Sequence, residues 1–128
     1  MIQVVVKPGT SQKDYVVRDT EQTVVRSTPL ANVMATEEGW LIRLAVPGLS
    51  REAVQINIEK HTLTVEGTYP ANAEGEKGVL RREFGKGILS RSFILPETAE
   101  TGAIQAKCEA GILEIRIPKK AAIQIPVL

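Results

Sequence analysis

The side chains best suited to acid–base or nucleophilic chemistry are few in this sequence. His61 is the only histidine and Cys108 the only cysteine among 128 residues. His61 lies in a polar stretch between two alternating segments, which is typical of a solvated turn histidine. Cys108 occupies an apolar position of its segment, which favours a small core residue over a nucleophile. No base, nucleophile and orienting carboxylate converge in the sequence, so we expect no catalytic residues and no enzyme.

Cofactor and nucleic-acid sites are equally poorly supported. A structural zinc site needs four Cys or His ligands, and the sequence has one of each. The glycine-containing segment 83–87 lacks the phosphate-loop pattern and precedes a strand pattern instead of a helix. The basic pairs at 81–82 and 119–120 have acidic neighbours, and 16 basic residues stand against 15 acidic ones. The sequence therefore predicts no metal, no cofactor and no nucleic-acid partner.

Targeting features are also lacking. No apolar run approaches the roughly 18 residues that a membrane span requires. The first residues, Met-Ile-Gln-Val-Val-Val-Lys-Pro, contain neither a charged n-region nor an apolar stretch of signal-peptide length. A single cysteine excludes an internal disulfide framework, which fits a reducing compartment. We expect a cytoplasmic protein without a membrane span.

The elements that position these residues are strands. The 12 isoleucines and 13 valines outnumber the 10 leucines, and β-branched side chains favour a pleated surface. Apolar residues alternate with polar ones in six short segments bounded by turn residues, at 40–46, 54–59, 62–66, 89–95, 104–109 and 112–117. This pattern predicts an all-β antiparallel sandwich in one domain, because the length suits a single domain. Further strands are possible at 4–6, 15–17 and 30–35.

Three segments do not follow the sandwich pattern. Residues 1–28 form short apolar triplets divided by turn residues, as in an extended arm. Residues 67–87 hold five glycines around Val79-Leu80, and a connection of this length is more often functional or extended than idle. The last residues alternate at Ile123, Ile125 and Val127, but nearby prolines disfavour a central strand. This tail could dock its alternate side chains on another sheet, pack on its own domain as an edge strand, or fray.

Several motifs, taken together, carry a family resemblance. Pro96 is followed by fourteen residues and then by Gly111-Ile112-Leu113, after Ala110. This resembles the signature that closes the α-crystallin domain of small heat-shock proteins, with Ile in place of Val. Segment 45–49 (Ala-Val-Pro-Gly-Leu) is similar to the family's "PG" turn, and 93–97 (Phe-Ile-Leu-Pro-Glu) to its "F-x-LP" element. Ile123-Gln124-Ile125 matches the C-terminal Ile-x-Ile anchor, and the resemblance covers about residues 29–128.

The resemblance implies an ATP-independent holdase of the bacterial and plant type. Such a protein has an immunoglobulin-like β-sandwich, binds unfolding client proteins, and assembles with itself into homodimers and higher homo-oligomers. The implied organisation is an N-terminal arm at 1–28, an α-crystallin domain at 29–119 and a C-terminal extension at 120–128. Within the domain, loop 68–86 is implied to carry a strand for the neighbouring protomer, and its centre is Val79, Leu80, Arg81 and Arg82.

The resemblance also implies where the Ile123 and Ile125 anchor binds. The accepting groove lies between the strands at 54–58 and 104–108, and its residues are Val54, Ile56, Ile104 and Ala106. Alternation alone places these four residues on apolar faces, where plain core packing is the simpler explanation; both can hold, because core residues form the floor of a groove between sheets.

The sequence departs from the family pattern in its first residues. Family members usually have a longer, phenylalanine-rich N-terminal arm, whereas Tyr15 is the only aromatic residue in 1–28.

One competing function uses the same fold. The alternative is an adaptor similar to the co-chaperone branch of this fold, which binds a specific folded partner. The Ile-x-Ile tail and the inserted loop favour the holdase. An enzyme that uses His61 or Cys108 is the least favoured hypothesis.

Overall fold

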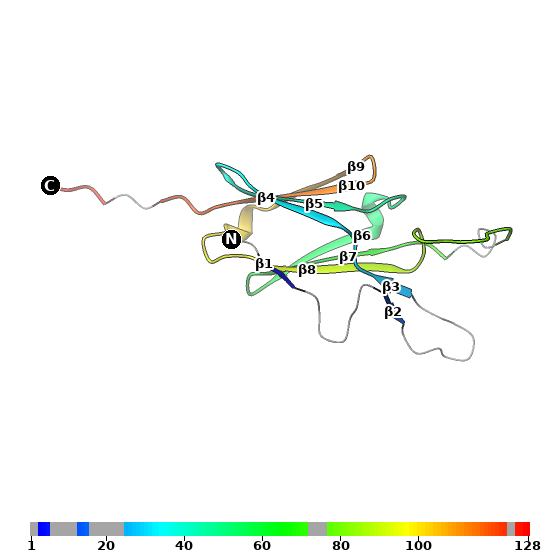
Figure 1. Ribbon diagram of the computed structural model, residues 1–128. Coiled ribbons are helices and arrows are strands. Elements are labelled where there is room, and N and C mark those ends of the chain that lie inside the picture. The colour runs from blue at the N-terminus through cyan, green and yellow to red at the C-terminus, as the bar shows by residue number, and fades with distance from the viewer. Residues whose placement is uncertain (1–2, 6–12, 16–24, 72–76, 123–124) are drawn as a thin grey trace.

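The computed structural model describes residues 3–5, 13–15, 25–71, 77–122 and 125–128. The chain forms ten strands and two short 3-10 helices in this part, arranged as two sheets that pack face to face (Figure 1). The elements are β1 (Gln3–Val5), β2 (Lys13–Tyr15), β3 (Val25–Ser27), β4 (Ala31–Ala35), β5 (Gly39–Ala45), η1 (Arg51–Ala53), β6 (Val54–Glu59), β7 (Thr62–Thr68), β8 (Ile88–Ile94), η3 (Thr101–Ala103), β9 (Gln105–Glu109) and β10 (Ile112–Pro118).

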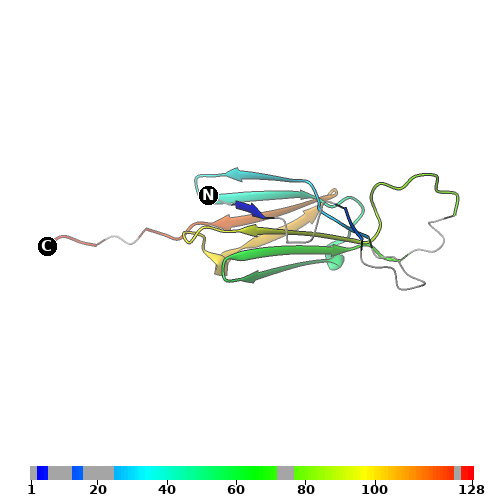
Figure 2. The same ribbon diagram turned by 60° about the horizontal axis from the view of Figure 1, so that its bottom comes forward.

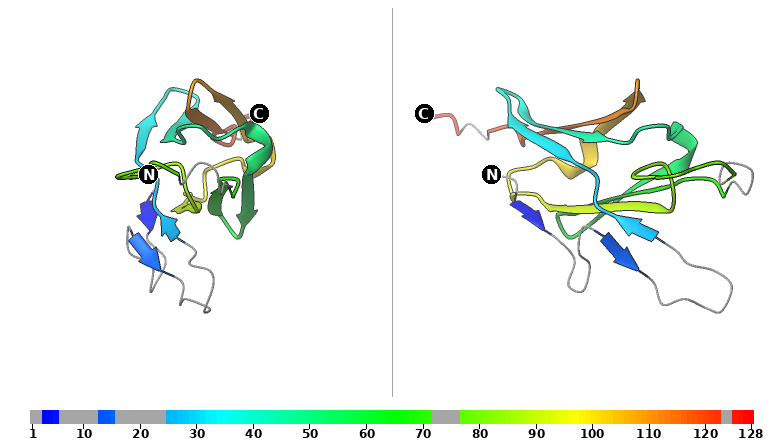
Figure 3. Two further views of the ribbon diagram at one scale, coloured as in Figure 1. Left: turned by 90° about the vertical axis from the view of Figure 1, so that its right-hand side faces the viewer. Right: turned by 45° about the vertical axis from the view of Figure 1, so that its right-hand side comes forward.

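Hairpins connect neighbouring strands within each sheet, and other connections cross from one sheet to the other. One sheet has the order β2-β3-β8-β7-β6, and β1 also pairs with β8. The other has the order β4-β5-β10-β9. All of these pairs are antiparallel except the parallel pair of β3 with β8. The end-on view in Figure 3 shows the two layers, and the predicted all-β sandwich is confirmed.

All six predicted strands are present, with bounds shifted by at most two residues. The possible strand at 30–35 is β4, and those at 4–6 and 15–17 overlap β1 and β2. The N-terminal segment differs from the expectation of an arm outside the sandwich, because its described parts are the strands β1, β2 and β3. Alternation could not reveal β3, because a three-residue strand is too short to show a period of two.

The core lies between the sheets and is aliphatic. Strand alternation turns one face of each strand inward, and the inward positions carry the buried side chains. Phe93 is the only phenylalanine buried there, and its side chain is fully covered. The core residues are Ile42, Leu44, Val46, Leu49, Leu63, Val65, Tyr69, Phe93, Leu95, Ala99, Leu113, Ile115 and Ile117.

Two tight turns explain the placement of His61 and of the Ala110-Gly111 pair. Lys60 and His61 have φ of 47° and 63°, and Ala110 and Gly111 have φ of 53° and 78°. Positive φ at both central residues of a two-residue hairpin is the type I′ geometry, which matches the twist of paired strands. The carbonyl of His61 accepts a hydrogen bond from the Leu95 amide at 2.7 Å. His61 therefore lies in the turn between β6 and β7, as predicted, but its Nε2 atom is buried without a hydrogen-bond partner, so the side chain is not the solvated one that was expected.

One side of the sandwich is closed by the chain itself. The connection 28–30 crosses from β3 in one sheet to β4 in the other. Along this crossing, Arg91 Nη1 donates to the Pro29 carbonyl at 2.7 Å, and the Ala45 amide donates to the Leu30 carbonyl at 2.9 Å. The opposite side ends in the edge strands β6 and β9. The long loop and the C-terminal tail leave the sandwich from opposite ends (Figure 2).

Candidate protein-interaction site

The edge strand β6 turns a partly uncovered apolar face toward the interior. Ile56 and Ile58 lie opposite Val65 and Leu63 of β7, and both β7 residues are core residues. Directly opposed residues share one face of a sheet, so Ile56 and Ile58 point inward as well. Ile56 and Val54 are nevertheless only half-buried, and Ile58 is 37% exposed. The inner face of β6 is therefore incompletely covered by the second sheet.

The edge strand β9 has the same property. Ala106 lies opposite Ile115, which is fully buried, and Cys108 lies opposite Leu113, which is 2% exposed. Both thus face inward, yet Ala106 is exposed and Cys108 half-buried. Ile104, just before β9, is half-buried as well. We call the inward apolar residues of the two edges the edge strip: Val54, Ile56, Ile58, Ile104, Ala106 and Cys108.

Leu49 connects the two halves of the edge strip. Its side chain lies over Gly67, where an added Cβ would be 2.6 Å from Leu49 Cδ1, and Gly67 is the β7 partner of Val54. Its carbonyl oxygen is 4.0 Å from Cys108 Sγ, at the limit for a weak S–H donor. The four residues predicted for the accepting groove thus lie on the two edges of one side. Ile58 and Cys108 also belong to this surface, and the same alternation could have identified them.

The long loop presents apolar residues at its far end. Val79 is 39% exposed and the Leu80 side chain is fully exposed. Arg81 forms an ion pair with Glu83 at 3.3 Å, and both side chains are largely exposed. The described residues of the loop, 69–71 and 77–87, form turns and bends and contain no strand. A strand at Val79–Arg82, which the family resemblance implies, is therefore not formed within a single protomer.

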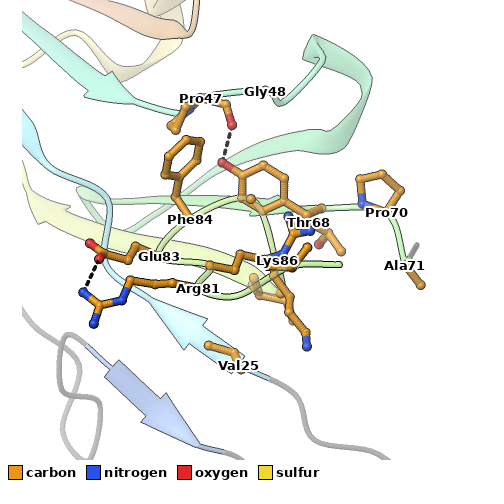
Figure 4. A pocket seen from close by; sticks show the side chains of 16 residues that line it. Val25, Pro47, Gly48, Thr68, Pro70, Ala71, Arg81, Glu83, Phe84 and Lys86 are labelled. Carbon is orange, nitrogen blue, oxygen red and sulfur yellow. Dashed lines mark hydrogen bonds and ion pairs between the residues drawn. The ribbon is translucent and has the colours of Figure 1, made fainter. Parts of the chain in front are cut away.

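A hollow of about 970 Å³ lies where the loop meets the body of the domain (Figure 4). Its lining includes Pro47, Tyr69 and Phe84, and Phe84 is 68% exposed. The Tyr69 hydroxyl donates a hydrogen bond to the Pro47 carbonyl, which ties the base of the loop to the turn after β5. Burial raises the pKa of the Tyr69 hydroxyl above its ordinary value.

The C-terminal tail extends away from the domain (Figure 1). Ile125 is 82% exposed and Val127 is 95% exposed, and Ile123 lies outside the described residues. An exposed apolar edge is also present at β4, where Val33 and Met34 are 36% and 38% exposed. Alternation in the sequence does not distinguish β4 as an interaction surface.

The signature residues have structural roles. Ala110 and Gly111 form the type I′ turn, and the Gly111 carbonyl accepts the Val46 amide at 2.8 Å. Leu113 is in the core and Ile112 is half-buried beside it. The Pro96 carbonyl accepts the Ala99 amide at 2.9 Å. The motif thus specifies the turn that connects β9 to β10, and it supplies no reactive side chain.

Metal-binding groupings do not form among the described residues. No three His, Cys, Asp or Glu side chains come together there as ligands for a metal ion. Within the same part of the chain, no helix has the length and apolar character needed to cross a membrane.

The sequence matches a protein-family model and is similar to the sequences of known proteins. Residues 32–127 match the model of the Hsp20/alpha crystallin family. Small heat shock protein C2 of Rickettsia felis is 34% identical over 102 residues, which cover 79% of this chain and 64% of that protein. The 18 kDa heat shock protein of Streptomyces albus is 32% identical over 111 residues, which cover 82% of this chain and 76% of that protein. The chain thus spans slightly less than two thirds of the Rickettsia protein.

Solved structures share the fold. A small heat-shock protein from Xylella fastidiosa superposes with a TM-score of 0.70 at 24% identity, covering 79% of this chain and 94% of that one. HspA from Xanthomonas axonopodis superposes with a TM-score of 0.66 at 28% identity, covering 75% of this chain and 97% of that one.

Proposed function

Because the chain belongs to the Hsp20/alpha crystallin family, whose members are chaperones, we propose that it is an ATP-independent holdase. In this proposal it binds partly unfolded proteins in the cytoplasm, prevents their aggregation, and works as homodimers assembled into larger homo-oligomers. The function needs no catalytic residue and no cofactor, since it consists of covering apolar surface.

The observation that carries the proposal is apolar surface that the protomer itself leaves partly or fully uncovered. The edge strip, Leu80 in the loop and Ile125 in the tail are exposed to different degrees and lie in separate parts of the molecule. Contiguous or projecting apolar surface of this kind marks protein-interaction sites. Three such surfaces on one small domain fit a protein that associates both with copies of itself and with unfolding chains.

The tail and the edge strip fit each other chemically. Residues at i and i+2 of an extended segment project to one side, so Ile123 and Ile125 can enter a common apolar surface together. The edge strip offers aliphatic side chains on two facing edges, and Ile125 of the same chain is exposed. We assign the edge strip as the surface that accepts the tail of a neighbouring protomer.

The loop and strand β4 form a second complementary pair. An edge strand presents unpaired backbone groups that another strand can join. Among the described edge strands, β6 and β9 border the edge strip, and β1 and β2 have only three residues each, which leaves the five-residue strand β4 with Val33 and Met34. We assign β4 as the strand that pairs with segment 79–82 of the partner's loop, which supplies the dimer.

The holdase function is tested by light scattering of citrate synthase during heating, with no ATP present. We expect scattering to be suppressed strongly at an equimolar subunit ratio, because each subunit offers its own binding surface. Serum albumin at the same mass concentration is the control for crowding. Scattering equal to that control would contradict the proposal, and a monomeric mass in the same buffer would then favour the adaptor alternative.

A further inference from the structure

The edge of β8 that faces away from β7 is occupied by the N-terminal part of the chain. Residues 26 and 27 of β3 pair with 88 and 89, and residues 3–5 of β1 pair with 92–94. Figures 1 and 3 show β1 and β3 along the same border of the sheet. Without these two short strands, β8 would present a seven-residue edge.

The strands that cover this edge are held much less firmly than β8 is held by β7. β3 contributes two register pairs and is parallel to β8, and parallel pairing is slightly weaker per residue. The β7–β8 pair has seven register pairs and is antiparallel. Arg26 reaches across β8 to Glu66 of β7 at 3.7 Å, but both side chains are more than one third exposed. An ion pair this open to solvent contributes little.

The features at the edge recognise backbone and not a particular side chain. At Gly87, an added Cβ would lie 2.0 Å from the Val25 carbonyl oxygen, so the bare glycine lets a strand pass in close contact. Arg91 is half-buried, lies 5.6 Å from the ring centroid of Phe93, and donates to the Pro29 carbonyl at 2.7 Å. Its Nε atom is buried without a partner. A carbonyl of any extended chain could replace that of Pro29.

We infer that the β8 edge is a strand-binding site for unfolding clients, and that residues 25–29 and 3–5 are its displaceable cover. This inference rests on the proposed holdase function and adds the location and chemistry of one client site. The expected occupant is an extended, β-branched segment, because the resident strands Gln3–Val5 and Val25–Ser27 contain valines. It binds by main-chain pairing, so it needs no defined sequence.

The first experiment locks the cover in place. In a Cys108→Ser background, Arg26→Cys with Ile88→Cys forms a disulfide across a register pair whose side chains share one face, and separations of paired residues suit such a bond. The oxidised protein should lose part of its suppression of citrate synthase scattering, and the reduced protein should keep it. Equal suppression by both forms would overturn the client site while the holdase function stands. No suppression by either form or by the unmodified protein would contradict the holdase function itself.

The second experiment loosens the cover. Gly87→Ala places a methyl group against the Val25 carbonyl, whereas Gly85→Ala meets only Arg82 Nη1 at 3.6 Å. The two glycines have similar positive φ, 82° and 92°, so both substitutions bring the same kind of backbone strain. The Gly87 carbonyl accepts the Tyr69 amide at 2.9 Å, so β3 is the part that must move. The Gly87→Ala variant should suppress citrate synthase scattering at a lower ratio of chaperone subunits to client than the Gly85→Ala variant. Equal ratios for the two variants would contradict the inference that residues 25–29 are a displaceable cover.

Hydrogen exchange on the unmodified protein tests the location without any substitution. When heat-unfolding citrate synthase is bound, the amides of residues 25–27 should lose protection while those of 88–94 keep it. Protection of 25–27 that is unchanged by the client would overturn the inference. Loss of that protection on concentrating the protein alone would also overturn it, because the occupant of the edge would then be a second copy of this chain.

Discussion

Tyr69 joins the base of the long loop to the body of the domain through one side chain. Tyr69 is 7% exposed, and its hydroxyl donates to the carbonyl of Pro47, which is 22 residues earlier in the chain. A partly buried carbonyl that loses its donor is destabilising, so the effect of removing this hydroxyl should be measurable.

We predict that Tyr69→Phe lowers the free energy of unfolding by about 1 kcal/mol at neutral pH, measured by urea denaturation. Burial raises the pKa of Tyr69 above its ordinary value of 10.0 in the folded state. The unfolded state then releases its proton first, so the contribution of Tyr69 is complete below pH 10 and is lost as pH rises through the folded pKa. The difference between the two proteins should therefore shrink above about pH 10. A constant difference would show that the phenol proton is not involved.

Ala106 tests the edge strip at a single position, because it faces inward and is still exposed. Ala106→Arg should place a long charged side chain in the surface that accepts the tail, and so reduce the oligomer mass in sedimentation. Gln105→Arg introduces the same residue one position earlier, on the opposite face of β9, and should leave the mass unchanged. Equal masses for the two variants would remove β9 from the assembly surface.

The tail is the element that the proposal places between protomers. Ile123→Ala combined with Ile125→Ala should reduce the oligomer mass, because each substitution removes most of an aliphatic side chain from the contact. Leu128→Ala is the matched control, since Leu128 is in the same tail, is fully exposed and lies outside the alternation of Ile123 and Ile125. An oligomer mass that is unaltered by the double substitution would exclude the tail from assembly.

The loop is expected to control the dimer. In the background with Ile123→Ala and Ile125→Ala, we predict a dimer of two 14.0 kDa chains. Adding Val79→Ser and Leu80→Ser should give a monomer, because these residues supply the apolar contacts of the exchanged segment. Phe84→Ser in the same background controls for loss of an exposed apolar residue from the same loop, and native mass spectrometry distinguishes the two states. A dimer that survives the Val79 and Leu80 substitutions would contradict the assigned role of the loop.

In the proposed function, assembly and client binding compete for the same kind of apolar surface. The contacts assigned to the tail involve few side chains, so heating should release subunits before the sandwich unfolds. We predict that native mass falls along a temperature ramp while far-ultraviolet circular dichroism still reports strand structure. Mass and circular dichroism that change together would indicate that release requires unfolding of the domain.

Alternation in the sequence was enough to predict the six main strands and the sandwich. It placed Ile42, Leu44 and Leu113 in the core, because residues at a spacing of two must share a face of a strand. Motif spacing was enough to indicate the family. These are local properties, and each can be read within a few neighbouring residues.

Tertiary structure alone decided which apolar positions are left uncovered. Val65 and Ile56 have the same alternation, but Val65 is in a central strand and Ile56 in an edge strand, so only the second sheet determines which of them is covered. The pairing of β1 and β3 with β8 was equally hidden, because main-chain hydrogen bonds join residues far apart in the chain without regard to side-chain type. Alternation and motif spacing were enough for the strands, the core faces and the family, whereas three-dimensional packing determined which edges stay uncovered, and the proposed function places the contacts with other chains at those edges.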